Sequence, residues 1–241
     1  MATSGVSNLF SVYAQSYLNQ TNARVQKTLE QLSSGSRINS AADDPAGISM
    51  VDEMQAQDSY LSQLQTNNAI TEGSLNVASG ALSQVNSLLD QQVTLSTAAA
   101  NGTLTPAQEN ANNLEYQSNQ ALISQIESNT SYNGSSVFAN NPAASSLPGI
   151  QQSLNSEDLS SSSDAQSALS AVNSAVSGVS AAEGGYGTQI NALDASSAVD
   201  NTEETNTQAA LNAIQATDYA KASSELEQGK LLMQAGLSVM A

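Results

Sequence analysis

The 241-residue chain contains no cysteine, histidine or tryptophan, which excludes disulfides, thiolate or imidazole metal sites and nucleophile–imidazole catalysis. Its net charge is −17, and residues 38–220 contain no lysine or arginine. Of its 22 acidic residues, only Glu30, Glu225 and Glu227 lie outside that segment, which leaves 19 inside. Because such a segment repels phosphate groups, we expect no nucleic-acid partner. Because thiols and imidazoles are missing, we also expect no enzymatic activity and no cofactor or metal.

The hydrophobic residues suit narrow helical bundles. They make up 39% of the chain, many of them are alanine, and aromatic residues make up 4%. Small apolar residues at helical spacing form thin layers in which each helix buries one stripe. The apolar runs are too short for a membrane span, and the first residues lack the pattern of a cleaved signal peptide, so we expect no membrane partner.

The first predicted element is a helix over residues 5–32. Its apolar positions alternate in steps of three and four, which indicates one helix with a single face to bury. These positions are Phe10, Ala14, Leu18, Thr21, Val25, Thr28 and Leu32. Threonine and alanine weaken this face, so the helix needs a partner to be stable.

A joint follows at residues 32–47, in the sequence LSSGSRINSAADDPAG. Gly35 can adopt a positive φ, and Asp44 before Pro45 is a helix-start signal. Asn39 and Ser40 are typical turn residues, whose side chains can bond their own backbone. For Arg37 two interpretations stay open: a hydrogen bond to a carboxylate or carbonyl of a neighbouring copy, or a surface arginine with a weak local ion pair.

A second, long helix is predicted from a three–four alternation kept through five heptads, which is typical of a coiled-coil-like helix. The stripe comprises Met54, Gln57, Leu61, Leu64, Asn68, Thr71, Leu75, Ala78, Leu82, Val85 and Leu89. We interpret Asn68 and Thr71 as polar layers that either set the register or merely weaken the seam, and not as a binding site. The helix should end near Ala100, before the turn at 101–106.

Thr105, Pro106 and Gln108 form a predicted capping box for a shorter third helix. We predict that this helix buries the stripe Ala107, Ala111, Leu114, Ser118, Leu122 and Ile126. The helical period is lost from 135 to 164, where residues 137–139 and 150–154 are each short enough to form strands of a small hairpin.

The last predicted helices restore the alternation. The stripe comprises Leu169, Val172, Val176, Val179, Glu183, Tyr186, Ile190, Leu193, Ser197, Asp200, Glu204, Thr207, Leu211 and Ile214. Glycines at 184, 185 and 187 predict a local break or a close helix approach. The terminal helix carries Tyr219, Ala222, Leu226, Met233, Leu237 and Met240.

Together these elements predict a mainly all-α fold. We expect a long antiparallel coiled-coil rod of three to four helices, with a small hairpin and turn region at 135–164. Residues 1–42 and 216–241 would pair as a terminal coiled coil, and residues 43–215 would form the rod. Long thin helices leave apolar stripes uncovered, so we expect the chain to associate with copies of itself.

Two quoted stretches carry a family resemblance. LSSGSRINSAADDPAG resembles the N-terminal signature of bacterial flagellins, with Pro45 where many members have alanine, and QAGLSVMA at the other end is similar to their C-terminal signature. The resemblance implies a minimal flagellin without separate outer domains, whose terminal coiled coil lines the inner tube of the filament and whose rod forms the outer tube.

The function implied by the resemblance is that of a structural subunit of the extracellular flagellar filament used for swimming. Its expected partners are further copies, the cap and hook-junction proteins, and an export chaperone of the type III pathway. Alternatives from the sequence are a hook–filament junction protein or a secreted acidic coiled-coil adhesin or effector. For assembly we single out Phe10, Leu18, Val25, Leu32, Tyr219, Leu226, Met233 and Leu237 in the terminal coiled coil, and Arg37, Asn39, Asp43 and Asp44 at the joint.

Two further sites follow from the resemblance. Flagellins carry a stretch that Toll-like receptor 5 recognises, and the corresponding residues here include Leu89, Gln91, Val93 and Leu95 but neither of its arginines. Arginines often dominate binding energy, so we expect weak or no recognition. Flagellins often carry O-linked sugars, and the candidate positions for them here are Ser160, Ser161, Ser162 and Ser163.

Overall fold

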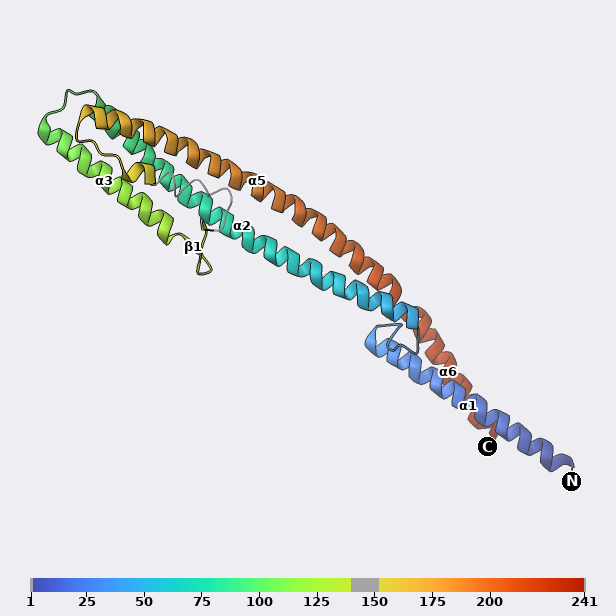
Figure 1. Ribbon diagram of the computed structural model, residues 1–241. Helices are drawn as coiled ribbons and strands as arrows, with labels where there is room; N and C mark the ends of the chain where they lie inside the picture. The colour runs from blue at the N-terminus through green and yellow to red at the C-terminus, as the bar shows by residue number, and fades with distance from the viewer. Residues whose placement is uncertain (1, 140–151, 241) are drawn as a thin grey trace. The chain divides into compact units, whose positions relative to one another are not determined.

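The computed structural model describes the backbone of residues 2–139 and 152–240, and side chains within 12–139 and 152–238. Figure 1 shows long helices: α1 (Ala2–Ser34), α2 (Pro45–Ala100), α3 (Pro106–Asn129), α5 (Ser162–Gln215) and α6 (Tyr219–Met240). Strands β1 (Ser131–Tyr132) and β2 (Ser135–Ser136) pair antiparallel. The predicted fold class is confirmed: α1 packs antiparallel to α6, α2 packs antiparallel to α5, and the hairpin is small.

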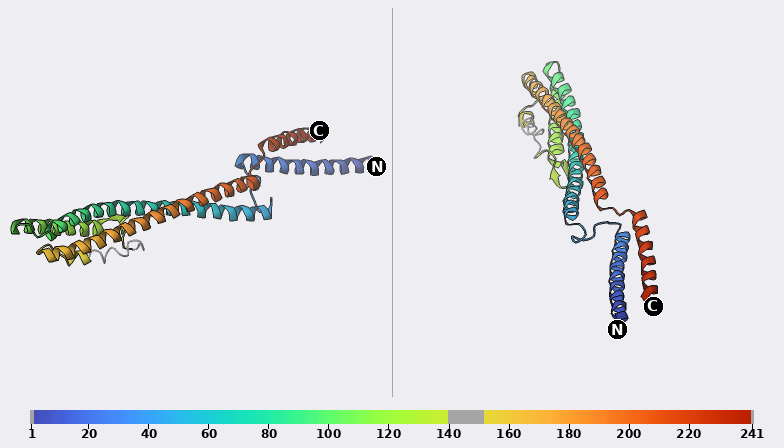
Figure 2. Two further views of the ribbon diagram at one scale, coloured as in Figure 1. Left: turned by 90° about the horizontal axis from the view of Figure 1, so that it is seen from above. Right: turned by 90° about the vertical axis from the view of Figure 1, so that its right-hand side faces the viewer.

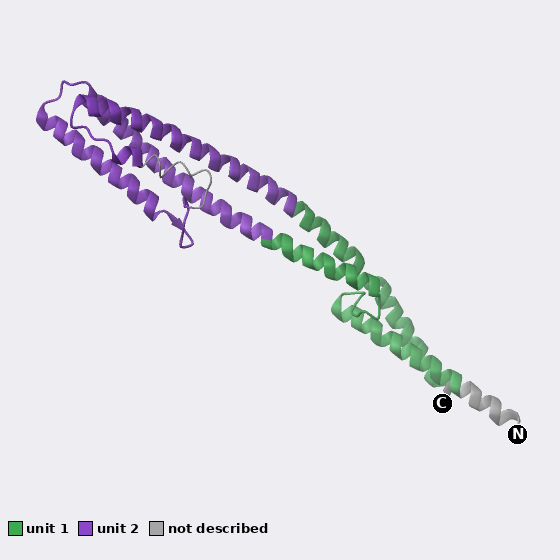
Figure 3. Ribbon diagram, in the orientation of Figure 1, with its two compact units in different colours: residues 1–63, 201–241 green, residues 64–200 purple. Residues whose placement is uncertain are grey.

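The chain divides into two compact units (Figure 3). The first unit comprises residues 1–63 and 201–241, and the second comprises residues 64–200. In the first unit, the views of Figure 2 show α1 and α6 side by side. In the second unit, α2 and α5 run alongside one another, with α3 next to them.

The helices begin and end where local chemistry dictates. Gly35 has a φ of +72° and its N–H bonds the carbonyl of Gln31, which closes α1. At the start of α2, Asp44 Oδ1 accepts the N–H of Gly47 at 2.9 Å, with Pro45 in the first helical position. The predicted capping of α3 is confirmed, since Thr105 N–H donates to Gln108 Oε1 at 2.9 Å.

The second unit has a thin, alanine-rich core. The alanines that are at most 2% exposed are Ala78, Ala99, Ala165, Ala168, Ala175 and Ala182. Between them lie larger, fully buried residues such as Leu89, Tyr116 and Tyr186. Because alanine lets backbones approach closely, α2, α3 and α5 pack in a narrow bundle, as the composition predicts.

A polar layer interrupts the contact between α2 and α5. Asn68 Nδ2 donates to Asp200 Oδ2 at 3.2 Å and to Ser197 Oγ at 3.5 Å, and Asp200 is buried. Shifting one helix along the other would separate these groups, which supports the interpretation of Asn68 as a register-setting residue. Thr71, predicted in the same role, is exposed and bonds only its own helix at Asn67.

The predicted buried stripe of α3 is wrong over most of its length. Leu114 is 62% exposed and Leu122 is 43% exposed, whereas Tyr116 and Ile123 are buried. The other predicted positions Ala107, Ala111 and Ser118 are exposed as well. The buried face is fixed by polar contacts: the N–H of Leu159 donates to Asn113 Oδ1 at 3.1 Å, and Gln120 Nε2 donates to the carbonyls of Leu154 and Glu157.

The predicted hairpin exists but lies earlier in the chain. Asn133 and Gly134 have φ values of 49° and 79°, which is the geometry of a tight type I′ turn, and they join β1 to β2. Residues 137–139 form bends and a turn, and 152–155 are helical, so neither the first predicted strand nor the described part of the second is present there. Residues 140–151 lie outside the described part of the chain.

The glycines at 184, 185 and 187 do not break α5. The helix runs unbroken from Ser162 to Gln215, and a Cβ added at Gly184 or Gly187 would meet no atom within 4 Å. The predicted break is therefore wrong, and these two positions make no close approach either. Tertiary packing of Ala182 and Tyr186 in the core outweighs the local preference of glycine.

Because Tyr116 and Tyr186 are buried, we expect the folded chain to lose stability at alkaline pH. Burial raises the pKa of Tyr116 to about 12 and that of Tyr186 to about 12, above their ordinary value of 10.0. The phenol in the unfolded chain ionises first, so stability should fall as pH rises from about 10 to about 12. We expect Tyr116→Phe with Tyr186→Phe to flatten this loss in melts followed by circular dichroism. An equally steep loss in the double variant would contradict the prediction.

Candidate assembly surfaces

The α1–α6 contact in the first unit follows the predicted stripe of α1. Every predicted position from Ala14 onward is buried or half-buried, and most of the residues between them are exposed. These positions are Ala14, Leu18, Thr21, Val25, Thr28 and Leu32. The side chain of Phe10 lies outside the described residues. A three–four alternation thus selects the face that α6 covers.

Two glycines of α6 receive side chains of α1, and neither was predicted from the sequence. A Cβ added at Gly229 would lie 2.5 Å from Val25 Cγ2, and one added at Gly236 would lie 2.8 Å from Leu18 Cδ2. Real Cβ atoms do not approach this closely, so only glycine lets the two helices pack here. The two glycines continue the three–four spacing of Ala222, Leu226 and Met233, and that spacing was the signal available in the sequence.

Not every predicted residue of α6 faces α1. Leu226 and Met233 are half-buried, whereas Tyr219 is 57% exposed and Leu237 is 61% exposed. Tyr219 instead places its hydroxyl against Gly35, where an added Cβ would lie 2.9 Å away. Other large side chains of α1 and α6 also point away from the contact. These are Val12 (63% exposed), Tyr13 (61%), Tyr17 (70%), Leu231 (63%) and Leu232 (56%).

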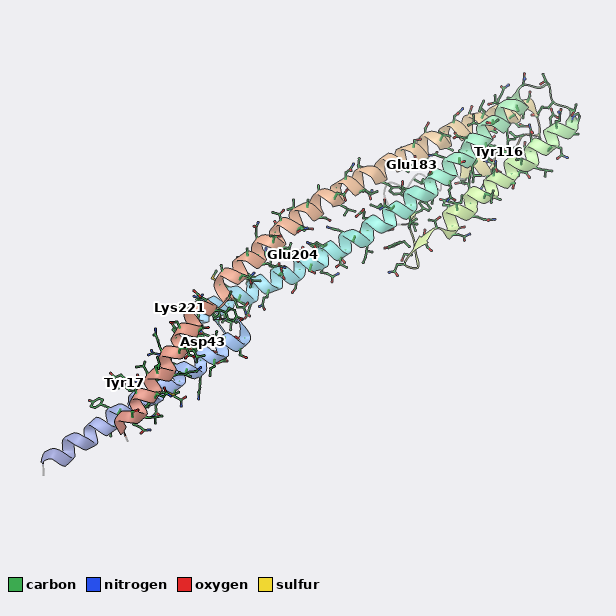
Figure 4. All side chains as sticks on the ribbon, turned by 180° about the vertical axis from the view of Figure 1, so that it is seen from behind. Tyr17, Asp43, Tyr116, Glu183, Glu204 and Lys221 are labelled. Atoms are coloured by element: carbon green, nitrogen blue, oxygen red, sulfur yellow. The ribbon has the colours of Figure 1, made fainter. Side chains whose placement is uncertain are left out.

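At the joint, the two connections of the first unit bond each other. The N–H of Arg37 donates to Gln215 O at 2.6 Å, and the N–H of Thr217 donates to Gly35 O at 3.0 Å, around an antiparallel bridge between Ser36 and Ala216. Figure 4 labels Asp43 and Lys221 near this point. The α1–α2 and α5–α6 connections are thus held together by backbone hydrogen bonds.

Arg37 serves the joint within its own chain. Its Nη2 donates to Ile214 O at 2.8 Å, and its carbonyl accepts Gln31 Nε2 at 2.9 Å. Among the described residues no carboxylate forms an ion pair with it. The carbonyl partner considered from the sequence is therefore present, but it belongs to α5 of the same copy. A contact between Arg37 and a neighbouring copy stays a prediction.

Asp43 is the centre of the loop before α2. Its Oδ2 accepts the N–H groups of Asn39 (3.2 Å) and Ser40 (3.1 Å), and its Oδ1 lies 2.6 Å from Lys27 Nζ of α1. The hydrogen bond from Lys27 and the N–H of Asn39 lower the pKa of Asp43 to about 2. Asn39 Nδ2 also donates to Ser36 O at 3.1 Å. The loop is therefore tied to α1 through one carboxylate.

The residues of the expected receptor stretch are only partly accessible. Leu89 is fully buried, and Val93 and Leu95 are half-buried. Gln91 is exposed, and its Oε1 accepts a hydrogen bond from Asn119 Nδ2 at 3.4 Å. The stretch thus presents little of its apolar surface to a partner.

The four candidate serines for O-linked sugars lie at the entry to α5 and are all exposed. They are Ser160, Ser161, Ser162 and Ser163. The N–H of Ser160 donates to Asp158 Oδ1 at 3.0 Å, so this residue belongs to the turn that leads into the helix. Ser161 caps the helix, since its hydroxyl accepts the N–H of Asp164 at 3.2 Å. Their accessibility is compatible with modification, which stays a prediction.

These features define a class of protein: a helical assembly subunit whose terminal helices pair and still leave large apolar side chains uncovered. The profile of the bacterial flagellin N-terminal helical region matches residues 6–143, and that of the bacterial flagellin C-terminal helical region matches residues 169–241. The chain belongs to the bacterial flagellin family. Flagellins are structural, non-enzymatic subunits of the flagellar filament of bacteria. As a member of this family, the chain has the same extracellular role in motility.

Two relatives support the family assignment by their sequences. The flagellin of Halalkalibacterium halodurans is 30% identical over 236 residues, which cover 90% of this chain and 86% of that protein. Polar flagellin C of Vibrio parahaemolyticus is 31% identical over 134 residues, covering 56% of this chain but only 35% of the relative. The crystal structure of Bacillus cereus flagellin matches at 21% identity and a TM-score of 0.48, over 54% of this chain and 85% of that one. No helix in the described residues has the length and hydropathy needed to cross a membrane.

Proposed function

We propose that copies of this chain polymerise through their paired terminal helices into the flagellar filament. The supporting observation is the set of exposed large side chains on α1 and α6, including Tyr17 at 70% and Leu231 at 63% exposure. Burying them against neighbouring copies is favourable, and repeated head-to-tail contacts that do not close produce a helical polymer. Electron microscopy of concentrated full-length protein tests this: we expect long tubes, and only monomers or closed oligomers would contradict it.

The domain division predicted from the sequence belongs to this proposal. Residues 1–42 and 216–241 would line the inner tube, and residues 43–215 would form the outer tube. The two connections at the joint, residues 35–44 between α1 and α2 and residues 216–218 between α5 and α6, lie near these predicted domain boundaries. Leu18, Val25 and Gly229 would keep the terminal pair together while its outward side chains contact other copies.

The remaining partners are also part of the proposal. A filament subunit exported by the type III pathway would meet an export chaperone, the cap protein and the hook-junction proteins. The exposed run from Ser160 to Ser163 would carry O-linked sugars, which intact mass of protein from the native filament would detect. A mass equal to that of the unmodified chain would contradict this part.

The charge of the chain predicts that salt promotes assembly. Subunits of net charge −17 repel each other, and about 0.1 M salt screens charges beyond roughly 10 Å. We expect the critical concentration for polymerisation to fall by about tenfold or more between low and moderate salt, and to fall again as the pH is lowered. Sedimentation of polymer across a salt series measures it. A critical concentration that rises with salt would contradict the prediction.

Recognition by Toll-like receptor 5 should be weak or absent. The stretch holds Gln91 and Gln92 but no guanidinium group, and both Leu89 and Gln92 are buried. Loss of arginine from a recognition surface commonly costs about 2 kcal/mol or more, which corresponds to roughly 30-fold in affinity. A reporter-cell assay with soluble protein measures it. A response at nanomolar concentration would contradict the expectation.

A further inference from the structure

Two Asn-Gly pairs lie in the second unit, Asn101–Gly102 and Asn133–Gly134. All four residues are exposed, and a residue with a hydroxyl group follows each pair, so the two sites have nearly the same local sequence. Because glycine has no side chain to hinder its backbone nitrogen, that nitrogen attacks a preceding asparagine amide more readily than in other pairs. The two sites therefore differ mainly in their surroundings in the folded chain.

The reaction open to such pairs is spontaneous deamidation, which needs only water. The backbone nitrogen of the glycine attacks the side-chain carbonyl carbon of the asparagine, and a new C–N bond forms. The C–N bond of the side-chain amide breaks, and its nitrogen leaves as ammonia with the proton of the glycine N–H. Water then opens the resulting succinimide ring at either carbonyl, which yields aspartate or isoaspartate. Either product adds a negative charge.

At Asn133 the fold holds the reacting atoms apart. Its φ of 49° is left-handed, and in that conformation the next backbone nitrogen lies nearly opposite the Cβ about the Cα–C bond. Attack would require roughly half a turn about that bond. Such a rotation would open the type I′ turn and separate Tyr132 from Ser135, its partner in the hairpin. Among the described residues no group accepts the N–H of Gly134, so the barrier at this site is the backbone geometry.

The hairpin is also fixed to the rest of its unit, which makes that rotation costly. A Cβ added at Gly73 of α2 would lie 2.8 Å from the hydroxyl of Tyr132, so the tyrosine packs directly on this glycine. Val137 and Phe138, directly after β2, are buried in the core. Opening the turn would disturb these contacts. Local opening that breaks packed contacts is rarer than fraying at the end of a helix.

Asn101 has none of these restraints. It follows the last residue of α2, and its φ is negative. The N–H of Gly102 donates to Ala99 O at 3.3 Å, which is a long hydrogen bond. A Cβ added at Gly102 would meet no atom within 4 Å, so no side chain packs on this turn. Rotation at Asn101 therefore breaks a single weak hydrogen bond at a helix end, where local opening costs least.

We propose that Asn101 is a spontaneous deamidation site of the folded chain and that the hairpin protects Asn133 from the same reaction. Conversion of Asn101 adds a negative charge to the turn that leads to the α3 cap at Thr105. The isoaspartate product also lengthens the backbone of this turn. The modified chain is therefore more acidic in a segment, residues 38–220, that contains no lysine or arginine. The inference concerns a single chain and does not depend on the proposed polymerisation.

The test compares the two sites within one sample. Full-length protein is incubated at mildly alkaline pH, either folded or unfolded in concentrated urea, and mass spectrometry of peptides follows conversion at Asn101 and Asn133. The peptides come from cleavage after glutamate, because trypsin would leave both sites in one fragment. In urea we expect similar rates at the two sites. In the folded chain we expect Asn101 to react at least about tenfold faster than Asn133, at close to its rate in urea.

Two results would overturn the inference. One is an equal rate at the two sites of the folded chain, or a faster reaction at Asn133. The other is a folded chain in which Asn101 stays unconverted while the same residue reacts in urea.

A variant tests whether the hairpin is the cause of the protection. Tyr132→Ala removes the side chain that packs on Gly73, so conversion of Asn133 should become severalfold faster while that of Asn101 stays unchanged. The matched control is Tyr60→Ala, which removes a 62% exposed tyrosine of α2 and should change neither rate. Circular dichroism checks that both variants keep their helical content. An unchanged rate at Asn133 in folded Tyr132→Ala would overturn the inference, as would an equal rise in the control.

Discussion

Replacing Gly229 with alanine should loosen the α1–α6 pair, although alanine is the better helix former. The new Cβ would lie 2.5 Å from Val25 Cγ2, and a β-branched valine in a helix has essentially one side-chain rotamer and cannot turn away. Overpacking typically costs about 1 to 3 kcal/mol, against a gain of about 1 kcal/mol in helix propensity. Gly236→Ala should have a smaller effect, because Leu18 has more freedom to move. The double variant should lose most of the pairing.

Hydrogen exchange of α1 and α6 amides measures this effect directly, and the critical concentration for polymerisation should rise with it. The matched control is Gly184→Ala with Gly187→Ala, where each added Cβ meets no atom within 4 Å. That variant should gain about 1 kcal/mol per site and melt at a higher temperature. If the α1 amides of the Gly229→Ala variant are as well protected from exchange as those of the unmodified chain, the close approach of the two helices is not the reason for the glycine.

Removing the carboxylate of Asp43 should disorder the loop between α1 and α2. Asp43→Ala leaves the N–H groups of Asn39 and Ser40 without their acceptor and frees Lys27 of α1. We expect rapid exchange of these two amides and a rise in the critical concentration of about tenfold. Glu53→Gln, a change at an exposed acid of α2, is the matched control and should leave both unchanged. Undiminished protection of the Asn39 and Ser40 amides in Asp43→Ala would refute this role.

The same carboxylate gives a defined pH dependence. Because Lys27 and the N–H of Asn39 lower its pKa from 3.8 to about 2, Asp43 protonates more readily in the unfolded chain than in the folded one. Its contribution to stability is therefore complete above about pH 4 and is lost as the pH falls toward about 2. We expect this acid-dependent loosening of the loop to be smaller in Asp43→Asn. An identical pH profile for the two proteins would contradict the assignment.

Sequence periodicity predicted the helices and most of their buried stripes, because an apolar side chain every three or four residues is a local property of the chain. It failed at α3, where Leu114 and Leu122 competed with Tyr116 and Ile123 for the same role. Hydrogen bonds between α3 and residues 154–159 decide the outcome, and they depend on tertiary structure. It also missed Gly229 and Gly236, since a residue without a side chain adds nothing to an apolar pattern.

The structure of the joint could also be predicted from the sequence only in part. Helix-start and turn signals at Asp44, Pro45 and Gly35 are local and were confirmed, as was the capping of α3. The bridge between Ser36 and Ala216 joins residues 180 positions apart, and neither carries a side chain that would mark the pairing. Only the antiparallel return of the chain brings the two connections together.

That bridge has a mechanical consequence. A propeller transmits torque, and a single extended strand leading out of a helix would carry all of it through one backbone. The backbone hydrogen bonds of Arg37 and Thr217 join the outgoing and returning connections to each other. Load applied to either terminal helix is therefore divided over two segments of the backbone.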